Sequence, residues 1–313
     1  MSVLFAVSVS WFSSVSFWLH SLTLLCLIAG LAFTLLRRST TLAGNAPRLS
    51  AFIRFGPLLF AVPLALFGMQ HFALHDVVVN GVPSWMPAHM FWVWLVGAAL
   101  IAASLSIMTG RVARLAALLV GIMLFLFVVM IYIPNAASNP GDRFAFALLF
   151  RDLALSGGAL ALAGTLAADK HAPTAKWLRL TGRYFFGLPM IVFGVENFLH
   201  PQYAPGVPLP KLMPGWLPGH TIWAWLTGAV LVIGGLSILF NKRGSLAAVI
   251  IGMSYLALVL FVYMPMEIVH PSIEISGELD YVADTLVFSG AALLVAGSLL
   301  VPGAKEVARS NRR

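Results

Sequence analysis

The sequence has little charge and a single cysteine. Asp, Glu, Lys and Arg make up 10% of its 313 residues, whereas soluble globular domains contain about 25%. Cys26 has no second cysteine with which to form an internal disulfide, and no CxxC pair is present, so internal thiol–disulfide chemistry is excluded. The sequence also lacks a Walker loop, a GxGxxG after a strand and a nucleophile elbow. These absences argue against a nucleotide-dependent enzyme and against an α/β-hydrolase.

Apolar residues, in contrast, make up 60% of the chain. Uncharged stretches near the roughly 20 residues that cross a bilayer recur along it. We therefore predict an all-α integral membrane protein with nine transmembrane helices. The predicted spans are Ser16–Leu36, Phe55–Leu74, Met90–Thr109, Leu115–Ile133, Phe146–Ala167, Tyr184–Leu199, Thr221–Phe240, Leu246–Met264 and Val282–Val301.

The basic residues predict the orientation, because Lys and Arg in short loops stay on the cytoplasmic side. Of the 19 basic residues, 16 fall on one side of the predicted spans, leaving Arg143, Arg151 and Lys211 on the other. This predicts a multi-pass protein of the plasma (inner) membrane, with its N-terminus outside and its C-terminus in the cytoplasm. The net charge of +8 is explained by orientation and by anionic lipid headgroups, so membrane lipids are expected partners and nucleic acid is not.

From Arg54 onward, the same pattern of Pro, Gly and aromatic residues occurs twice. Pro63, Phe67, Gly68 and Phe72 match Pro189, Phe193, Gly194 and Phe198 at an offset of 126. After a loop that is longer in the second copy, the offset becomes 131, and near the end we align Asp152 and Gly158 with Asp284 and Gly290 at an offset of 132. The residues aligned at 131 include Trp85, Pro87, His89, Trp92, Gly97, Gly121 and Tyr132, which match Trp216, Pro218, His220, Trp223, Gly228, Gly252 and Tyr263.

This internal duplication predicts two four-helix units in the same orientation, because each has an even number of spans. We expect residues 1–50 to form an N-terminal transmembrane anchor, not a cleaved signal peptide, and a cytoplasmic linker. Residues 51–168 form the first unit, 169–181 a cytoplasmic linker, 182–302 the second unit and 303–313 a basic cytoplasmic tail. The two units are expected to be parallel four-helix bundles.

Unusual polar residues gather at the outward ends of the predicted helices, in equivalent places in both copies. Such a group at one end of a helix bundle predicts a ligand-binding cleft that is open to the outside. The candidate binding residues are Gln70, His71, His89, Tyr132, Arg151, Asp152, Glu196, Asn197, His220, Tyr263 and Asp284. No catalytic residue is assigned.

Several of these residues have a structural alternative. Glu196 is interpreted either as an inward-facing carboxyl that holds or moves a proton, or as an interfacial Glu bonded to a Trp, His or Tyr. Asp152 and Asp284 are expected near the start of their helices, where capping alone explains them. Neighbouring residues on a helix point about 100° apart, so Arg151 is expected to meet a ligand anion or lipid headgroups and not Asp152.

The histidines do not predict a metal. His71, His75 and His89 are spaced for one, but the second copy has Asn197 and His200 in place of the first two, so no ligand set repeats. Haem is disfavoured because every candidate histidine lies at the same depth. His89 and His220 align between the copies, and either position the next helix or exchange protons with a nearby carboxyl group.

Each half resembles a DoxX-like four-helix membrane unit, over about Arg54–Val301. The resemblance is carried by Gly68–Phe72, Val82-Pro83, Arg114–Ala117 and Asp152–Leu160 in the first copy, and by Gly194–Phe198, Val207-Pro208, Thr227-Gly228 and Ser289–Leu293 in the second. Related units often carry a Glu where this chain has Leu100 and Leu231, and an Asn that has a counterpart only in Asn135. The resemblance implies the four-helix fold and a kinship with membrane subunits linked to quinol oxidation.

Three functions are therefore considered. The first is binding of a small amphipathic molecule, a quinone or a lipid, in outward-facing clefts, with a redox-chain or membrane-complex partner. The second is transport of a small solute, including proton-coupled transport, through a site between the two halves. The third is a non-catalytic assembly role.

Overall fold

The computed structural model describes residues 47–207, 210–269 and 277–301. The described residues are all-α, and their only β feature is an isolated bridge between Tyr203 and Leu212. The first half contains α3 (Pro47–Ile53), α4 (Gly56–Ala73), α5 (His75–Val78), a 3₁₀ turn (Val79–Gly81), α6 (His89–Thr109), α7 (Ala113–Phe127), α8 (Ile133–Ser138) and α9 (Arg143–Thr165). The second contains α10 (Pro173–Leu199), α11 (His220–Leu239), α12 (Gly244–Leu258), α13 (Met264–Val269) and α14 (Glu278–Leu299).

Seven helices of this part of the chain are long and apolar enough to cross a membrane, counting α3–α4, α7–α8 and α12–α13 each as one helix. Their bounds are Leu49–Ala73, His89–Thr109, Ala113–Ser138, Arg143–Thr165, His220–Leu239, Gly244–Val269 and Leu279–Leu299. The sixth predicted span, Tyr184–Leu199, falls in α10, which is not among the seven. The first predicted span, Ser16–Leu36, lies outside the described residues.

The two copies build the same backbone. Helices α6 and α11 both follow a left-handed residue, Ala88 (φ 54°) and Gly219 (φ 71°). The helices after them, α7 and α12, likewise follow Val112 (φ 47°) and Arg243 (φ 54°). Each of these pairs is separated by the offset of 131 that the sequence pattern predicts.

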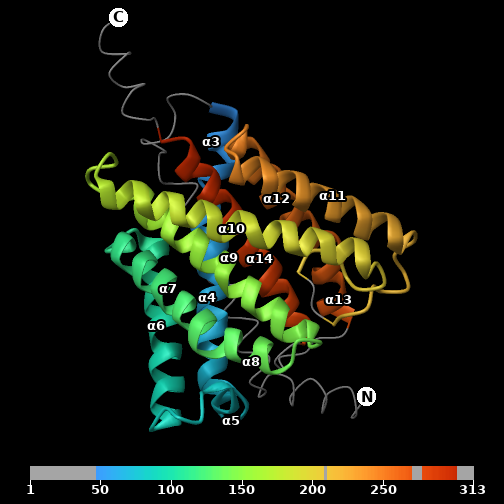
Figure 1. Ribbon diagram of the computed structural model, residues 1–313, viewed down its shortest axis with the longest axis horizontal. Helices are drawn as coiled ribbons and strands as arrows, with labels where there is room; N and C mark the ends of the chain where they lie inside the picture. The colour runs from blue at the N-terminus through green and yellow to red at the C-terminus, as the bar shows by residue number, and fades with distance from the viewer. Residues whose placement is uncertain (1–46, 208–209, 270–276, 302–313) are drawn as a thin grey trace, which may run out of the picture.

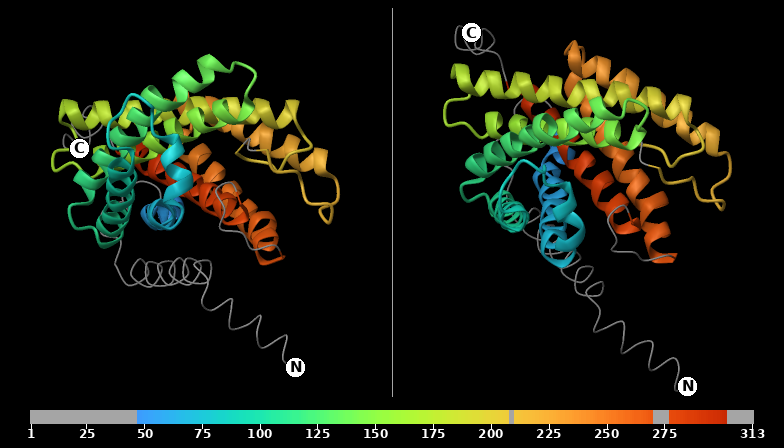
Figure 2. Two further views of the ribbon diagram at one scale, coloured as in Figure 1. Left: turned by 90° about the horizontal axis from the view of Figure 1, so that it is seen from below. Right: turned by 60° about the horizontal axis from the view of Figure 1, so that its bottom comes forward.

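The eight long helices form a closed ring in which the two copies interlock. Along the chain each helix packs on the next, from α4 through α6, α7, α9, α10, α11 and α12 to α14, and α14 then packs on α4. Helices α9 and α14 also contact each other, and α14 lies in the middle of the molecule between α6–α7 and α11–α12 (Figures 1 and 2). The expectation of two separate bundles is therefore wrong: the first helix of each copy packs on the fourth helix of the other copy more than on the fourth helix of its own.

The structure also corrects the register of the fourth helices from 132 to 133. The Ser156 hydroxyl donates to the Gly121 carbonyl (2.7 Å), and the Ser289 hydroxyl donates to the Gly252 carbonyl (2.8 Å). The Cα atoms of Gly157 and Gly290 likewise lie against the backbones of Phe186 and Phe60. Gly158 then corresponds to Ala291, with which it is in contact, so the pseudo-two-fold axis passes between these two residues.

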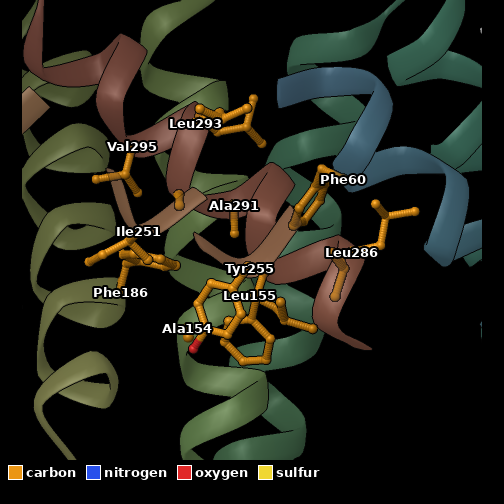
Figure 3. Packing of buried hydrophobic residues seen from close by; sticks show 14 of the residues in the cluster. Phe60, Ala154, Leu155, Phe186, Ile251, Tyr255, Leu286, Ala291, Leu293 and Val295 are labelled. Atoms are coloured by element: carbon orange, nitrogen blue, oxygen red, sulfur yellow. The ribbon is translucent and has the colours of Figure 1, made fainter. Parts of the chain in front are cut away.

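The apolar core lies around this axis. Phe60 and Phe186, which are equivalent in the two copies, are fully buried there together with Ala291 and Leu293 (Figure 3). Gly56, Gly157, Gly182 and Gly290 let the helix backbones approach closely, since an added Cβ would meet neighbouring backbone atoms. The centre of the molecule is therefore closely packed.

Candidate functional site

We call the end of the ring at which α4, α8, α10 and α13 finish the polar end, and the opposite end the basic end. A buried ionic cluster of Arg151, Asp152 and Asp284 lies beside the pseudo-two-fold axis, towards the polar end. Arg151 Nε donates to Asp152 Oδ1 (2.9 Å), and Arg151 Nη1 donates to Asp284 Oδ2 (3.5 Å). Both carboxylates have a relative exposure of 2%. Arg151 lies about 12 Å along α9 from its first residue, at about 1.5 Å per residue, so this cluster is well inside the helix layer.

Two expectations about this cluster are wrong. Arg151 does pair with its neighbour Asp152, because its long side chain folds back and overcomes the 100° separation of the two positions. The two aspartates also do not cap their helices. Asp142 caps α9 by accepting hydrogen bonds from the amides of Phe144 and Ala145, and Asp284 lies inside α14.

With the corrected register, Asp284 corresponds to Arg151. The ionic pair Arg151–Asp284 thus joins equivalent positions across the pseudo-two-fold axis, two helical turns from Gly158–Ala291. Two identical chains related by such an axis would place like charges here. Duplication within one chain allows opposite charges to face each other instead.

Tyrosines from both copies complete the cluster. The helices α7–α8 and α12–α13 each contain a π-helical turn, Val128–Tyr132 and Val259–Tyr263, which again differ by 131 residues. Tyr132, at the end of the first turn, faces Arg151, and Tyr263, at the end of the second, faces Thr285. Tyr263 is buried and stacks on Tyr281 with 5.9 Å between ring centroids.

Gln70 extends the cluster towards α4. Its side-chain amide donates a short hydrogen bond to Asp280 Oδ1, and both residues are buried. This bond joins the first helix of the first copy to the fourth helix of the second. On the same side, Lys211 Nζ lies 5.9 Å from the centroid of the Tyr281 ring.

Glu196, the equivalent of Gln70, makes the corresponding connection on the other side. Its Oε2 accepts from Arg143 Nε (3.0 Å) and Nη2 (2.9 Å), joining α10 of the second copy to α9 of the first. The Arg143 guanidinium also lies over the Tyr203 ring at 4.7 Å, and His200 Nε2 is 3.8 Å from Glu196. Glu196 therefore lies in an ion pair at a partly exposed position, apart from the central cluster.

Asn197 and His71 are equivalent residues with different roles. Both donate to the carbonyl one turn earlier, Asn197 to Phe193 (2.7 Å) and His71 to Phe67 (2.7 Å). Asn197 also accepts from the Gly206 amide (3.1 Å) and donates to its carbonyl (3.2 Å). It thereby anchors the longer loop of the second copy, whose residues 204–207 are buried at the polar end. Tyr263 adds a hydrogen bond to the Pro205 carbonyl (2.7 Å).

His89 and His220 occupy the first positions of α6 and α11, away from the cluster. His89 Nε2 bonds to the Pro83 carbonyl (3.1 Å). The preceding loops are held by equivalent indoles: Trp92 donates to the Pro87 carbonyl (3.0 Å) and Trp223 to the Pro218 carbonyl (3.1 Å). Among the described residues, the basic side chains next to the Glu196 carboxylate are those of Arg143 and His200 and not that of His220.

Of the predicted site residues, the structure brings together Tyr132, Arg151, Asp152, Tyr263 and Asp284, with Gln70 linked to them through Asp280. It places the others apart from this group: His71, His89, Glu196, Asn197 and His220. Sequence reasoning missed Asp280, Tyr281, Thr285 and Arg143. Asp280 lies one turn before Asp284 and Thr285 one residue after it. If that segment is taken as a helix, both residues are therefore expected near Asp284. No group of three or more His, Cys, Asp or Glu within the described residues is arranged to hold a metal ion.

Comparison with known proteins does not identify the chain: no family model, curated protein or solved structure matches it. The resemblance to DoxX-like units therefore stays a prediction.

Proposed function

We propose that this chain is a multi-pass inner-membrane protein whose polar end faces outwards. Seven helices with the length and composition of membrane spans support this proposal. So does the position of most of the described Lys and Arg residues at the basic end. The three exceptions each have a local interaction at the polar end: Arg143 with Glu196, Arg151 with Asp152 and Asp284, and Lys211 with the Tyr281 ring.

We further propose that it carries a small solute together with a proton, at the buried cluster between the two copies. The observation behind this proposal is that two buried carboxylates, Asp152 and Asp284, share a single guanidinium. With all three groups ionised, this trio has a formal charge of −1. Asp284 Oδ1 is buried and, within the described part of the chain, makes no hydrogen bond.

A buried charge without full compensation is costly, and intramembrane ionisable groups mark proton and substrate paths. A proton or a cationic solute bound at Asp284 would bring the trio to neutrality and satisfy this oxygen. The position agrees with the role, because transporters built from repeats hold their substrate and coupling ion where the repeats meet. A lone structural ion pair does not require the second carboxylate.

The test is proton movement in proteoliposomes that contain a pH-sensitive dye. A potassium diffusion potential, negative inside, is imposed with and without an external mixture of small organic cations, anions and neutral solutes. Protein-dependent acidification that the solutes increase is expected for the native chain, and its loss is expected for Asp284→Asn. Asp76→Asn is the matched control, since Asp76 is an acid at the same end with a side chain that is 86% exposed. A folded native protein that moves no protons in either condition would contradict the proposal.

Binding of a quinone or lipid is the second candidate, including a role as a redox-associated subunit. The stacked Tyr263 and Tyr281 favour it, because aromatic rings near Asp284 would hold a quinone ring, and Arg151, which pairs with Asp284, would donate to a quinone carbonyl group. Mass spectrometry of molecules that copurify in mild detergent separates the candidates. A quinone that copurifies stoichiometrically with the native protein but not with Arg151→Gln would favour a redox function over transport.

A further inference from the structure

Each of the three largest interfaces between the copies has the same two-part construction. Towards the polar end, each is joined by one polar pair: Gln70–Asp280 between α4 and α14, Arg151–Asp284 between α9 and α14, and Glu196–Arg143 between α10 and α9. We call these the three cross-copy pairs. Gln70 and Glu196 occupy equivalent positions in the two copies. Arg151 and Asp284 are also equivalent to each other, and they pair directly.

Deeper along the same interfaces, the helices meet through glycine and alanine. Gly290 lies against the Phe60 backbone between α14 and α4, and Gly158 against Ala291 between α9 and α14. Gly157 and Gly182 lie against each other between α9 and α10. Figure 3 shows Phe60, Phe186 and Ala291 in this region. We call these contacts the small-residue seam.

The two parts have different physical properties. Contacts between backbones at van der Waals distance cannot separate without loss of dispersion energy at every atom, and nothing polar compensates for that loss. Polar pairs are replaceable, because water or a ligand can supply the same hydrogen bonds when the partners separate. Separation of the copies is therefore easiest at the polar end, with the seam as its fulcrum.

We propose that the two outer cross-copy pairs, Gln70–Asp280 and Glu196–Arg143, form a gate over the buried Arg151–Asp284 pair, and that this structure is its closed state. The gate opens when the polar ends of the two copies move apart about the Gly158–Ala291 contact, which exposes Asp284 to the outside. This inference rests on the proposed transport function, because it assigns the path by which the solute reaches that site. The Glu196–Arg143 pair is the outermost one to hold it, with side chains that are 27% and 30% exposed.

The gate is tested by distance measurements between spin labels on the full chain, in a Cys26→Ser background. Phe91 and Ile222 are equivalent, exposed residues near the polar ends of α6 and α11, and Leu105 and Leu236 are equivalent, exposed residues further towards their basic ends. Each pair is changed to cysteine and labelled, and distances are measured by double electron–electron resonance in lipid nanodiscs. Glu196→Gln is expected to add a longer component to the Phe91–Ile222 distances and to leave the Leu105–Leu236 distances unchanged.

Three further variants complete the design. The reversed pair, Arg143→Glu with Glu196→Arg, is expected to restore the native distances, and Asp76→Asn is expected to leave them native. If Glu196→Gln does not fold, as judged by gel filtration, Arg143→Gln replaces it. Unchanged outer distances in the folded single variant, or equal shifts of both label pairs, would overturn the gate.

The outcome is independent of the proton assay. Longer outer distances in a protein that moves no protons would support the gate and contradict the transport function. Proton movement that depends on Asp284, without any change in the outer distances, would support the transport function and contradict the gate.

Discussion

At the residue scale, Arg151 compensates two buried charges, because its guanidinium contacts both Asp152 and Asp284. Its replacement by Gln would leave two buried carboxylates facing each other without a cation. Breaking a buried ion pair by removing one partner typically costs about 3–5 kcal/mol. We expect Arg151→Gln to lower the free energy of unfolding by about this amount, measured by denaturant titration in detergent.

The matched control for this prediction is His75→Gln. His75 Nε2 lies 3.3 Å from Asp76 Oδ1 at the same end, but its side chain is 41% exposed. Exposed substitutions of this kind usually change stability by less than about 0.5 kcal/mol. Equal effects of the two substitutions would show that the Arg151 trio carries no net buried charge, which would also remove the basis of the proposed proton site.

The sequence alone could identify the residue types of this site but not their pairing. Polar residues are rare in the apolar stretches, so Tyr132, Arg151, Asp152 and Asp284 stand out, and the structure does bring them together. The pairing depends on a register shift of one residue in the fourth helix, which places Asp284 opposite Arg151 and not equivalent to Asp152. An alignment that matches Asp152 with Asp284 does not show this relation, because matching identical residue types favours the wrong offset of 132.

At the scale of the elements, α14 depends on a glycine where it crosses α4. A Cβ on Gly290 would overlap backbone atoms of Leu59 and Phe60, which cannot move aside as a side chain does. Alanine in a helix is otherwise more stable than glycine by about 0.5–1 kcal/mol, whereas overpacking costs about 1–3 kcal/mol. We expect the clash to dominate in Gly290→Ala, which should lower the midpoint of thermal unfolding.

Gly297 provides the control within the same helix. Within the described residues, its Cβ would meet only the Ile53 side chain, at 3.1 Å, and that side chain can adjust. Gly297→Ala should therefore leave the midpoint nearly unchanged or raise it. If both substitutions lowered it equally, glycine would be needed in α14 for a reason other than the crossing with α4.

Helix positions were largely predictable, because long apolar stretches between basic and turn residues mark them. The π-helical turns were not, since Val128–Tyr132 and Val259–Tyr263 have the composition of any apolar helix. The burial of the longer loop of the second copy could not be predicted either. It is buried because Asn197 bonds both backbone groups of Gly206, and a sequence pattern does not distinguish this role from that of a cleft residue.

At the scale of the whole molecule, the interlocked ring explains why the two copies could not be assigned to separate bundles from the sequence. Periodicity shows which face of a helix is apolar, but α4 and α10 are apolar enough to pack on the fourth helix of either copy. The contact that decides is the crossing of Gly157 and Gly290 with Phe186 and Phe60. It joins helices that lie in different copies, so no local pattern contains it.

The orientation of the whole ring gives the last prediction, because every outward-facing assignment of the site depends on it. Reporter domains fused after Gly110, Asp169 or Lys242, which lie between helices at the basic end, should report the cytoplasm. Fusions after Asn80, Asn139 or Gln202, at the polar end, should report the outside. The physical reason is the retention of Lys and Arg on the cytoplasmic side, and Arg143, Arg151 and Lys211 do not oppose it, since each is engaged within the protein. Adding basic residues next to Asn139 should weaken the outside signal of that fusion. A cytoplasmic signal after Asn139 in the unmodified chain would place the polar end inside and turn the proposed gate towards the cytoplasm.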